Sequence, residues 1–176
     1  YFGSGIYDET LGFYVPSSTV IYNKDRYLRR TPNRDGFMDI DHDRQRSPGV
    51  TRVGFFGDSY VESVQVPLET VFFRQIPSRT TANVETFGFG ISGIGTLQSS
   101  LIYQRYASEY DLDVAVYVFV PNDLGDHFER IQRGRRGTLT PPIAADLAAN
   151  EQGFEVFAPP PPDELPMRQR WAMRLK

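Results

Sequence analysis

The sequence contains no cysteine. This absence excludes disulfide frameworks, thiol nucleophiles and cysteine-based zinc sites. It leaves the compartment open, because a chain without cysteine tolerates either redox environment. No apolar run approaches the roughly 20 residues of a membrane-spanning helix, so we expect no membrane span. The net charge of −3 lacks the basic excess of nucleic-acid-binding proteins, and we therefore expect no nucleic-acid partner.

What is present suffices for one domain with a hydrophobic core, because 40% of the 176 residues are hydrophobic and 14% are aromatic. Both ends look like cuts in a longer protein. Tyr1 is not a methionine, and a helix expected to begin near Asp163 has no stop signal before Lys176. We divide the chain into an N-terminal appendage packed on the main domain, a core, and an insertion or lid that runs into a helix. These parts are residues 1–50, 51–127 and 128–176.

Within the core, continuous apolar runs alternate with segments whose apolar residues recur at helical spacing. Short, nearly continuous apolar runs predict strands over residues 51–58, 83–90 and 113–120. Apolar residues at helical spacing predict helices over residues 68–79 and 95–110 between these strands. The order strand, helix, strand, helix, strand predicts a right-handed α/β arrangement around a parallel sheet.

Both flanks of the core are less regular. FYVPSSTVIY predicts one or two short strands around Pro16. The aromatic residues between Tyr1 and Tyr27 are expected to pack in a small core, with a sugar-binding face as the alternative. The C-terminal flank contains a basic loop, a short predicted helix within residues 140–153 and a proline-rich connector.

Polar or flexible residues directly follow each predicted strand of the core. Gly57-Asp58-Ser59 follows the first strand, Gly90-Ile91-Ser92-Gly93 the second and Pro121-Asn122-Asp123 the third. Ligands of open parallel sheets bind outside the carboxyl ends of the strands. With the spatial order second, first, third, these segments would converge on one crevice.

The residue types in these segments fit acyl transfer. A serine in a tight strand-to-helix turn, here Ser59, exposes its hydroxyl near a helix N-terminus, and Gly57 lets the turn form without a Cβ clash. The N–H groups of Ser59 and Gly93 and the amide of Asn122 would form a three-donor oxyanion hole. Taken singly, these residues could be only a helix cap and two turn residues. Their shared placement favours the catalytic interpretation.

Three motifs resemble the sequence blocks of SGNH/GDSL hydrolases: GDSY at 57–60, FGFGISGIGT at 87–96 and FVPND at 119–123. PNRDGFMD and VESVQVPLETVF are also similar to the bacterial envelope-type members. The resemblance covers roughly the stretch from the first of these phrases to the third block. It implies a three-layer α/β/α, flavodoxin-like SGNH domain with a parallel sheet, truncated here at its C-terminus.

The resemblance also implies roles for individual residues. Ser59 would be the nucleophile, and Gly93 and Asn122 would donate hydrogen bonds to the oxyanion. Asp58 is expected to cap the helix after the first strand or to orient the nucleophile turn. Asp123 is expected to bond backbone near the site rather than to take part in the chemistry.

The general base is expected outside the printed chain. The fourth block of the family, a late Asp-x-x-His, does not occur here, so the base and its orienting aspartate are expected beyond Lys176. His127, four residues past Asp123, is the alternative base. The third block also departs from the family, because Val120-Pro121 stands where a glycine usually precedes the asparagine, and Pro121 offers no backbone donor.

Four charged or titratable residues of the appendage are expected to be solvated. His42 lies in a charged turn before the first predicted strand. The alternation of Asp39, Asp41 and Asp43 could mark a cation site, but it lacks the glycine and distal glutamate of a calcium-binding loop. A solvated turn is the preferred interpretation, and we expect no metal and no organic cofactor.

The resemblance implies a serine-dependent ester hydrolase that works through an acyl-enzyme on a small acyl ester. Its substrate would be a small molecule or an ester of a glycan or lipid. One alternative is an O-acyltransferase that acetylates an envelope polysaccharide, and another is a non-catalytic SGNH-fold binding domain. The bacterial envelope or periplasm and the cytoplasm both remain open, as does the oligomeric state.

Overall fold

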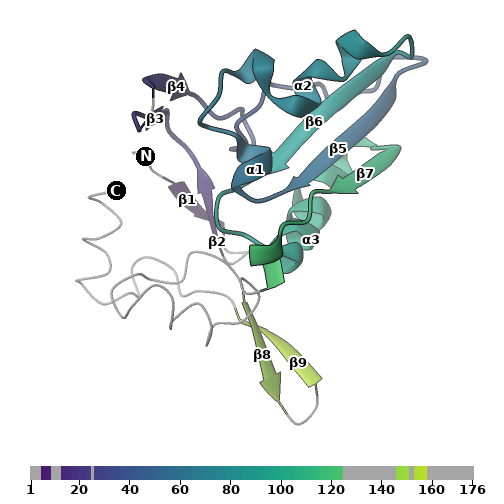
Figure 1. The fold of residues 1–176 in the computed structure, drawn as a ribbon. Helices are drawn as coiled ribbons and strands as arrows, with labels where there is room; N and C mark the ends of the chain where they lie inside the picture. Colours follow the sequence, from purple (N-terminus) through teal and green to yellow (C-terminus); the bar gives the residue numbers. More distant parts are fainter. Residues whose placement is uncertain (1–4, 9–12, 25, 125–145, 151–152, 158–176) are drawn as a thin grey trace.

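The fold is centred on a parallel sheet of three strands in the order β6–β5–β7 (Figure 1). The strands are β5 (Thr51–Gly57), β6 (Val84–Gly90) and β7 (Val114–Tyr117). This is the second, first, third order under which the three polar segments of the sequence would converge. The protein is seen in a computed structural model that describes residues 5–8, 13–24, 26–124, 146–150 and 153–157.

Helices cover both faces of this sheet. On one face, Phe55 packs with Val61 of α1 (Ser59–Glu62) and Phe73 of α2 (Phe72–Gln75). On the other face, Phe56 lies in a cluster with Ile102 of α3 (Thr96–Arg105). Successive side chains of a strand point to opposite faces, so the neighbours Phe55 and Phe56 each anchor one helical layer. The molecule is therefore a mixed α/β protein with a parallel sheet between helices.

The predicted helix over residues 68–79 is wrong as one element. The chain there forms η1 (Leu68–Thr70), α2 and η2 (Pro77–Arg79). Val71 between the first two is extended, with φ −61° and ψ 137°. Pro77 has no N–H to continue the helix beyond α2. The apolar spacing is met only in part, because Val71 is buried but Phe72 is 42% exposed, and Phe73 is buried in its place.

The second predicted helix and the third predicted strand are both shorter than expected. α3 ends at Arg105 and is followed by a tighter turn, η3 (Ala107–Tyr110). β7 ends at Tyr117, although Val118 still donates to the carbonyl of Phe56 at 2.8 Å. A final short turn, η4 (Pro121–Leu124), follows.

Antiparallel hairpins contain the remaining described strands. The strands expected around Pro16 are present, and the predicted helix within residues 140–153 is wrong, because a strand stands there. Within the parts of the chain that the structure describes, no helix is long and apolar enough to cross a membrane. The hairpin strands are β1 (Gly5–Asp8) with β2 (Phe13–Pro16), β3 (Val20–Tyr22) with β4 (Leu28–Arg30), and β8 (Asp146–Asn150) with β9 (Gly153–Phe157).

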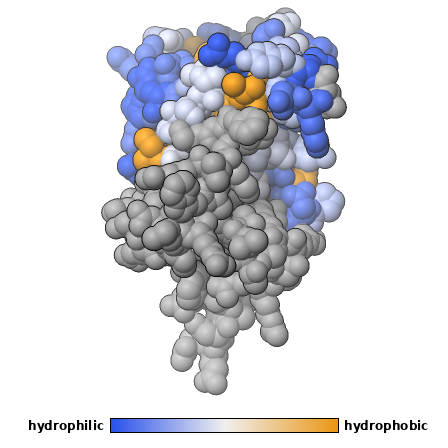
Figure 2. Space-filling view, turned by 90° about the vertical axis from the view of Figure 1, so that its left-hand side faces the viewer, coloured by the Kyte–Doolittle hydropathy of each residue, from blue (hydrophilic) through white to orange (hydrophobic). Residues whose placement is uncertain are grey.

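The N-terminal segment packs directly on the sheet. Val15 of β2 and Phe37 belong to the same buried cluster as Phe56 and Phe89. The Phe37 ring meets the Phe89 ring edge to face, with centroids 5.1 Å apart. Figure 2 views the molecule from the side of the first four strands, where the coloured surface is mostly hydrophilic and its apolar residues are scattered. Val15, Val20, Phe37 and Met38 of the segment are buried, whereas Ile6, Tyr27 and Ile40 are exposed.

The expectation that His42 and Asp39 are solvated is wrong. Both are buried, with exposed fractions of 5% and 4%. The imidazole lies between the carboxylates of Asp39 and Glu85, at 3.2 and 2.8 Å, and it stacks on Phe87. Arg74 pairs with Asp39 at 2.9 Å. Glu85, Phe87 and Arg74 come from distant segments, so the local charge pattern gave no sign of the burial. Asp41 and Asp43 are exposed, as expected.

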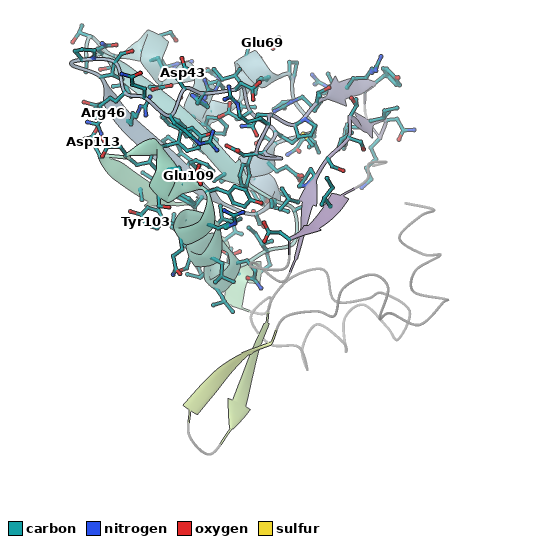
Figure 3. All side chains as sticks on the ribbon, turned by 180° about the vertical axis from the view of Figure 1, so that it is seen from behind. Asp43, Arg46, Glu69, Tyr103, Glu109 and Asp113 are labelled. Atoms are coloured by element: carbon teal, nitrogen blue, oxygen red, sulfur yellow. The ribbon has the colours of Figure 1, made fainter. Side chains whose placement is uncertain are left out.

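Arg52 joins the segment before the sheet to the sheet itself. Its side chain is 1% exposed, and its Nε donates to Glu85 at 2.9 Å. The two terminal nitrogens donate to four backbone carbonyls, those of Asp43, Arg44, Gln45 and Tyr110. Nearby, the more exposed Arg46 pairs with Asp113 at 3.0 Å (Figure 3). A planar guanidinium with five N–H donors can bond to several acceptors at once, as Arg52 does here.

We expect Arg52→Ala to lower the free energy of unfolding by about 2–4 kcal/mol, because it leaves buried carbonyls and a carboxylate without their donor. Urea denaturation followed by circular dichroism measures this. Arg34→Ala is the matched control: that side chain is 51% exposed in its pair with Asp41, and the loss should stay below about 1 kcal/mol. Equal losses for the two variants would contradict the role of Arg52.

Candidate functional site

The three segments singled out in the sequence meet at the carboxyl edge of the sheet. Because β5 lies between β6 and β7, the turn after β5 is flanked by the other two. The N–H of Ile91 donates to the carbonyl of Gly57 at 3.2 Å. The amide of Asn122 donates to the carboxylate of Asp58 at 3.1 Å. Both flanking segments therefore touch the turn that carries Ser59.

Ser59 is the first residue of α1 and is partly exposed. The preceding residue, Asp58, is the N-cap of this helix, and its carboxylate accepts from the N–H of Tyr60 at 3.0 Å. Gly57 is needed at the end of β5, because a Cβ there would lie 2.8 Å from the side chain of Val61 and 3.1 Å from the carbonyl of Val118. The turn is tight and presents Ser59 at the sheet edge.

Asp58 caps α1, as considered in the sequence, and also bonds to the segment after β7. It is 3% exposed, and it accepts hydrogen bonds from the backbone of α1 and from the side chain of Asn122. Asn122 itself is exposed, at the start of η4. The buried carboxylate thus connects the helix that begins at Ser59 to the segment that follows β7.

The segment after β6 is held against α1 by Glu62, a residue that the sequence reasoning missed. The Glu62 side chain is 1% exposed, and it accepts a hydrogen bond from the hydroxyl of Ser92. Gly93 follows with φ +83°, a conformation that favours glycine. Glu62 lies three residues after Ser59, on the same face of α1, but nothing in the local sequence marked it as buried.

Arg30 of β4 packs behind this arrangement. Its guanidinium donates to the carbonyls of Ser63 and Val66 at 3.0 and 2.8 Å, and to that of Met38. Burial lowers the pKa of Arg30, and the nearby carboxylate of Glu62 opposes that shift. The N-terminal segment therefore supports the chain immediately after α1.

Asp123 bonds to the backbone after β7, as expected from the sequence. It is fully buried, and it accepts from the N–H of Val120 at 2.9 Å and from the hydroxyl of Tyr117 at 2.6 Å. The Tyr117 hydroxyl also accepts from Thr96, the first residue of α3, at 3.0 Å. Burial, and next the hydrogen bond to Asp123, raise the pKa of Tyr117. This chain of bonds links η4 to α3 and was not expected from the sequence.

Among the described residues, no histidine is placed to act as a base for Ser59. His127 lies outside the residues that the structure describes. His42 bonds to Glu85, near the amino end of β6, whereas Ser59 lies at the carboxyl end of the sheet. In the described ranges, no group of three or more His, Cys, Asp or Glu side chains is placed to hold a metal ion.

Comparisons with known proteins add no family to this geometry. No protein-family model matches the chain, and no curated protein matches it.

The fit of α1 against β6 can be tested at Gly90. A Cβ at this position would lie 2.2 Å from the backbone nitrogen of Glu62 and 2.6 Å from the carbonyl carbon of Val61. Gly90→Ala must therefore push α1 away, and we expect a loss of about 1–3 kcal/mol or more in the free energy of unfolding. Amide chemical shifts should change most in residues 59–63.

Gly88→Ala, two residues earlier in the same strand, is the matched control. Its Cβ would meet only the ring of Phe73, at 2.2 Å. We expect this variant to lose stability as well, with the largest shift changes around α2 instead of α1. If both variants gave the same pattern of shifts, the contact between Gly90 and α1 would not be what holds that helix.

Proposed function

We propose that the chain is a serine-dependent ester hydrolase of the SGNH/GDSL type, with Ser59 as nucleophile. The observation that carries this proposal is the hydrogen bond between Asn122 and Asp58, 3.1 Å long. It holds the amide of the third motif beside the turn of the first. Gly93, in the second motif, lies on a loop that Ser92 fastens to the same helix through Glu62.

The proposed chemistry is a two-step acyl transfer. The Ser59 hydroxyl attacks the ester carbonyl and gives its proton to a general base, forming a tetrahedral oxyanion. The N–H groups of Ser59 and Gly93 and the amide of Asn122 donate to that oxyanion. The intermediate collapses to an acyl-serine, and the alcohol leaves with the proton from the base. Water, deprotonated by the same base, then releases the acid and restores Ser59.

Asp58 and Glu62 act as positioning residues in this mechanism. Preorganised donors are effective because they need no rearrangement when charge develops in the transition state. Asp58 orients the Asn122 amide, and Glu62 restrains the loop of Gly93 through Ser92. The general base of this proposal lies outside the described residues, and His127 is the histidine of the printed sequence that lies there.

Transfer of the acyl group to a carbohydrate would use the same acyl-enzyme. Only the acceptor differs, since a sugar hydroxyl would replace water in the second step. The described site contains no feature that favours transfer over hydrolysis, so hydrolysis is the function we propose.

We expect a fluorophosphonate probe to label Ser59 covalently in the full-length protein, because phosphonates trap an activated serine in a geometry that resembles the tetrahedral intermediate. Peptide mass spectrometry identifies the modified residue. Ser59→Ala should abolish the labelling, and it should also abolish hydrolysis of short-chain aryl esters.

Ser78→Ala serves as the control for probe specificity, since Ser78 is an exposed residue of η2. It should label as strongly as the unmodified protein. Labelling at any serine other than Ser59, or no labelling at all, would remove the nucleophile assignment. The latter result would favour a non-catalytic binding domain.

The role of Asn122 is tested by kinetics. We expect Asn122→Ala to lower kcat by on the order of a hundredfold or more and to leave KM within about a few-fold. The reason is that the amide meets the substrate oxygen strongly only when that oxygen carries negative charge. Steady-state hydrolysis of an aryl ester measures both constants.

The melting temperature separates catalysis from structure in this experiment. If Asn122 only shaped the turn after β7, the variant would melt earlier and keep its kcat. Asp58→Asn is an informative companion, because an asparagine can still cap α1 but no longer offers a charged acceptor to the amide. We expect it to reduce kcat less than Asn122→Ala does.

A further inference from the structure

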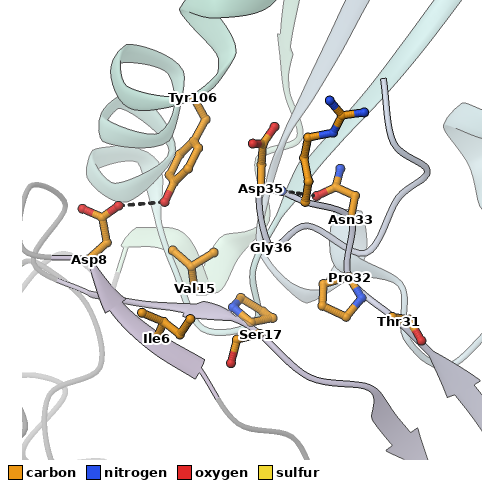
Figure 4. Close-up of a pocket in the computed structure, with 12 residues that line it drawn as sticks. Ile6, Asp8, Val15, Ser17, Thr31, Pro32, Asn33, Asp35, Gly36 and Tyr106 are labelled. Carbon is orange, nitrogen blue, oxygen red and sulfur yellow. Dashed lines mark hydrogen bonds between the residues drawn. The ribbon is translucent and has the colours of Figure 1, made fainter. Parts of the chain in front are cut away.

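A pocket of about 400 Å³ lies between the first hairpin and the end of α3 (Figure 4). Its volume falls within the roughly 300–1,000 Å³ of small-molecule sites, and it far exceeds the ~30 Å³ that one water occupies. Apolar and polar side chains alternate around it. Its lining includes Ile6, Asp8, Val15, Thr31, Asp35 and Tyr106.

The loop that forms one wall is rigidly built. The side chain of Asn33 accepts from the N–H groups of Asp35 and Phe37 at 3.1 and 2.9 Å, and it donates to the carbonyl of Ile40 at 3.1 Å. Gly36, with φ +89°, presses on β2 so closely that a Cβ would lie 2.1 Å from the side chain of Val15. The pocket is therefore formed before any ligand arrives.

Tyr106 fixes the opposite wall. Its hydroxyl donates to Asp8 of β1 at 2.7 Å, and its ring meets Phe37 edge to face at 5.4 Å. Burial, followed by the bond to Asp8, raises the pKa of Tyr106. The hydroxyl therefore stays protonated as a donor at physiological pH, and it ties the hairpin to α3.

The charges at the pocket are balanced. Asp35 accepts from Arg44 at 3.1 Å and from the hydroxyl of Tyr110. Arg34, the only cationic residue lining the described pocket, pairs with Asp41 at 3.4 Å. Among the described residues that line the pocket, no unpaired cation is offered to a phosphate or carboxylate. Each oxygen of Asp35 has a second lone pair, so the side chain can still accept from a ligand hydroxyl.

We propose that this pocket binds one neutral sugar unit of a glycan. A pyranose presents hydroxyls, which suit the carboxylate of Asp35 and the hydroxyl of Thr31. It also has an apolar C–H face, which suits Ile6, Val15 and the ring of Tyr106. Hydrogen bonds to a charged acceptor are stronger than those to a neutral one, so a sugar hydroxyl that donates to Asp35 would contribute a strong hydrogen bond.

The pocket is separate from the edge of the sheet that carries Ser59. Thr96, at the start of α3, bonds to Tyr117 at that edge, whereas Tyr106 follows the last residue of the same helix. The ten residues of α3 span about 15 Å. A sugar in the pocket would leave the candidate catalytic site open, and the proposal stands whether or not Ser59 is a nucleophile.

Saturation-transfer NMR of the full-length protein tests the proposal. The probes are maltotriose, cellotriose, xylotriose and chitotriose as neutral glycans, with trigalacturonate as an anionic control. We expect saturation transfer to at least one neutral trisaccharide and a weaker or absent effect with trigalacturonate. The Ser59→Ala variant should bind the sugar as well as the unmodified protein does.

Paired variants locate the binding. Ile6→Ala removes an apolar wall residue that is 68% exposed, and Ile40→Ala is its control on a side chain that is 46% exposed and outside the pocket. Asp35→Asn removes the charged acceptor, and Asp43→Asn is its control at an exposed position. We expect each pocket variant to weaken affinity by on the order of tenfold, while the controls leave it unchanged.

Three results would overturn the proposal. They are the absence of saturation transfer to every neutral trisaccharide, a preference for trigalacturonate, and binding that Ile6→Ala leaves unchanged. Because Ile6 is exposed, its variant tests the pocket without endangering the fold. Labelling of Ser59 by the phosphonate is measured separately, so the failure of one proposal is distinguishable from the failure of the other.

Discussion

Parallel pairing of β5 with a strand on each side is the constraint on which the rest of the molecule depends. The carboxyl ends of parallel strands lie at one edge of the sheet. Because β5 is the central strand, the turn that follows it lies between the segments that follow β6 and β7. Glycines at the ends of β5 and β6 let α1 lie directly against the sheet, since neither position has room for a Cβ. Ser59, Gly93 and Asn122 come together through this geometry.

Buried charge fastens the N-terminal segment to this frame. Arg30 of the segment donates to backbone carbonyls after α1. From the main domain, Arg52 donates to backbone carbonyls of the segment and Arg74 pairs with Asp39. His42 lies between two carboxylates. Removing charged groups from water is costly unless they are paired and hydrogen-bonded. These contacts therefore define where the segment sits. The same placement brings the first hairpin beside α3 and creates the pocket.

The sequence predicted the sheet better than the helices. Strands of a buried parallel sheet are nearly continuous apolar runs, and β5 and β6 fall almost wholly within the predicted ranges. The helix expected over residues 68–79 was wrong because periodicity could not show that Val71 is extended or that Phe73, rather than Phe72, is buried. The helix expected within residues 140–153 failed because alanine-rich spacing says little about the antiparallel partner that β8 finds in β9.

The sequence by itself determined which residues follow each strand, because strand ends are local features set by apolar runs and by glycine, proline and polar residues. The candidate site could therefore be named in advance. Only the tertiary structure decided the partners of Asp58, Glu62 and His42, because hydrogen bonds and burial join segments that lie far apart along the chain. It also created the pocket between the first hairpin and Tyr106, for which no single segment carries a signal.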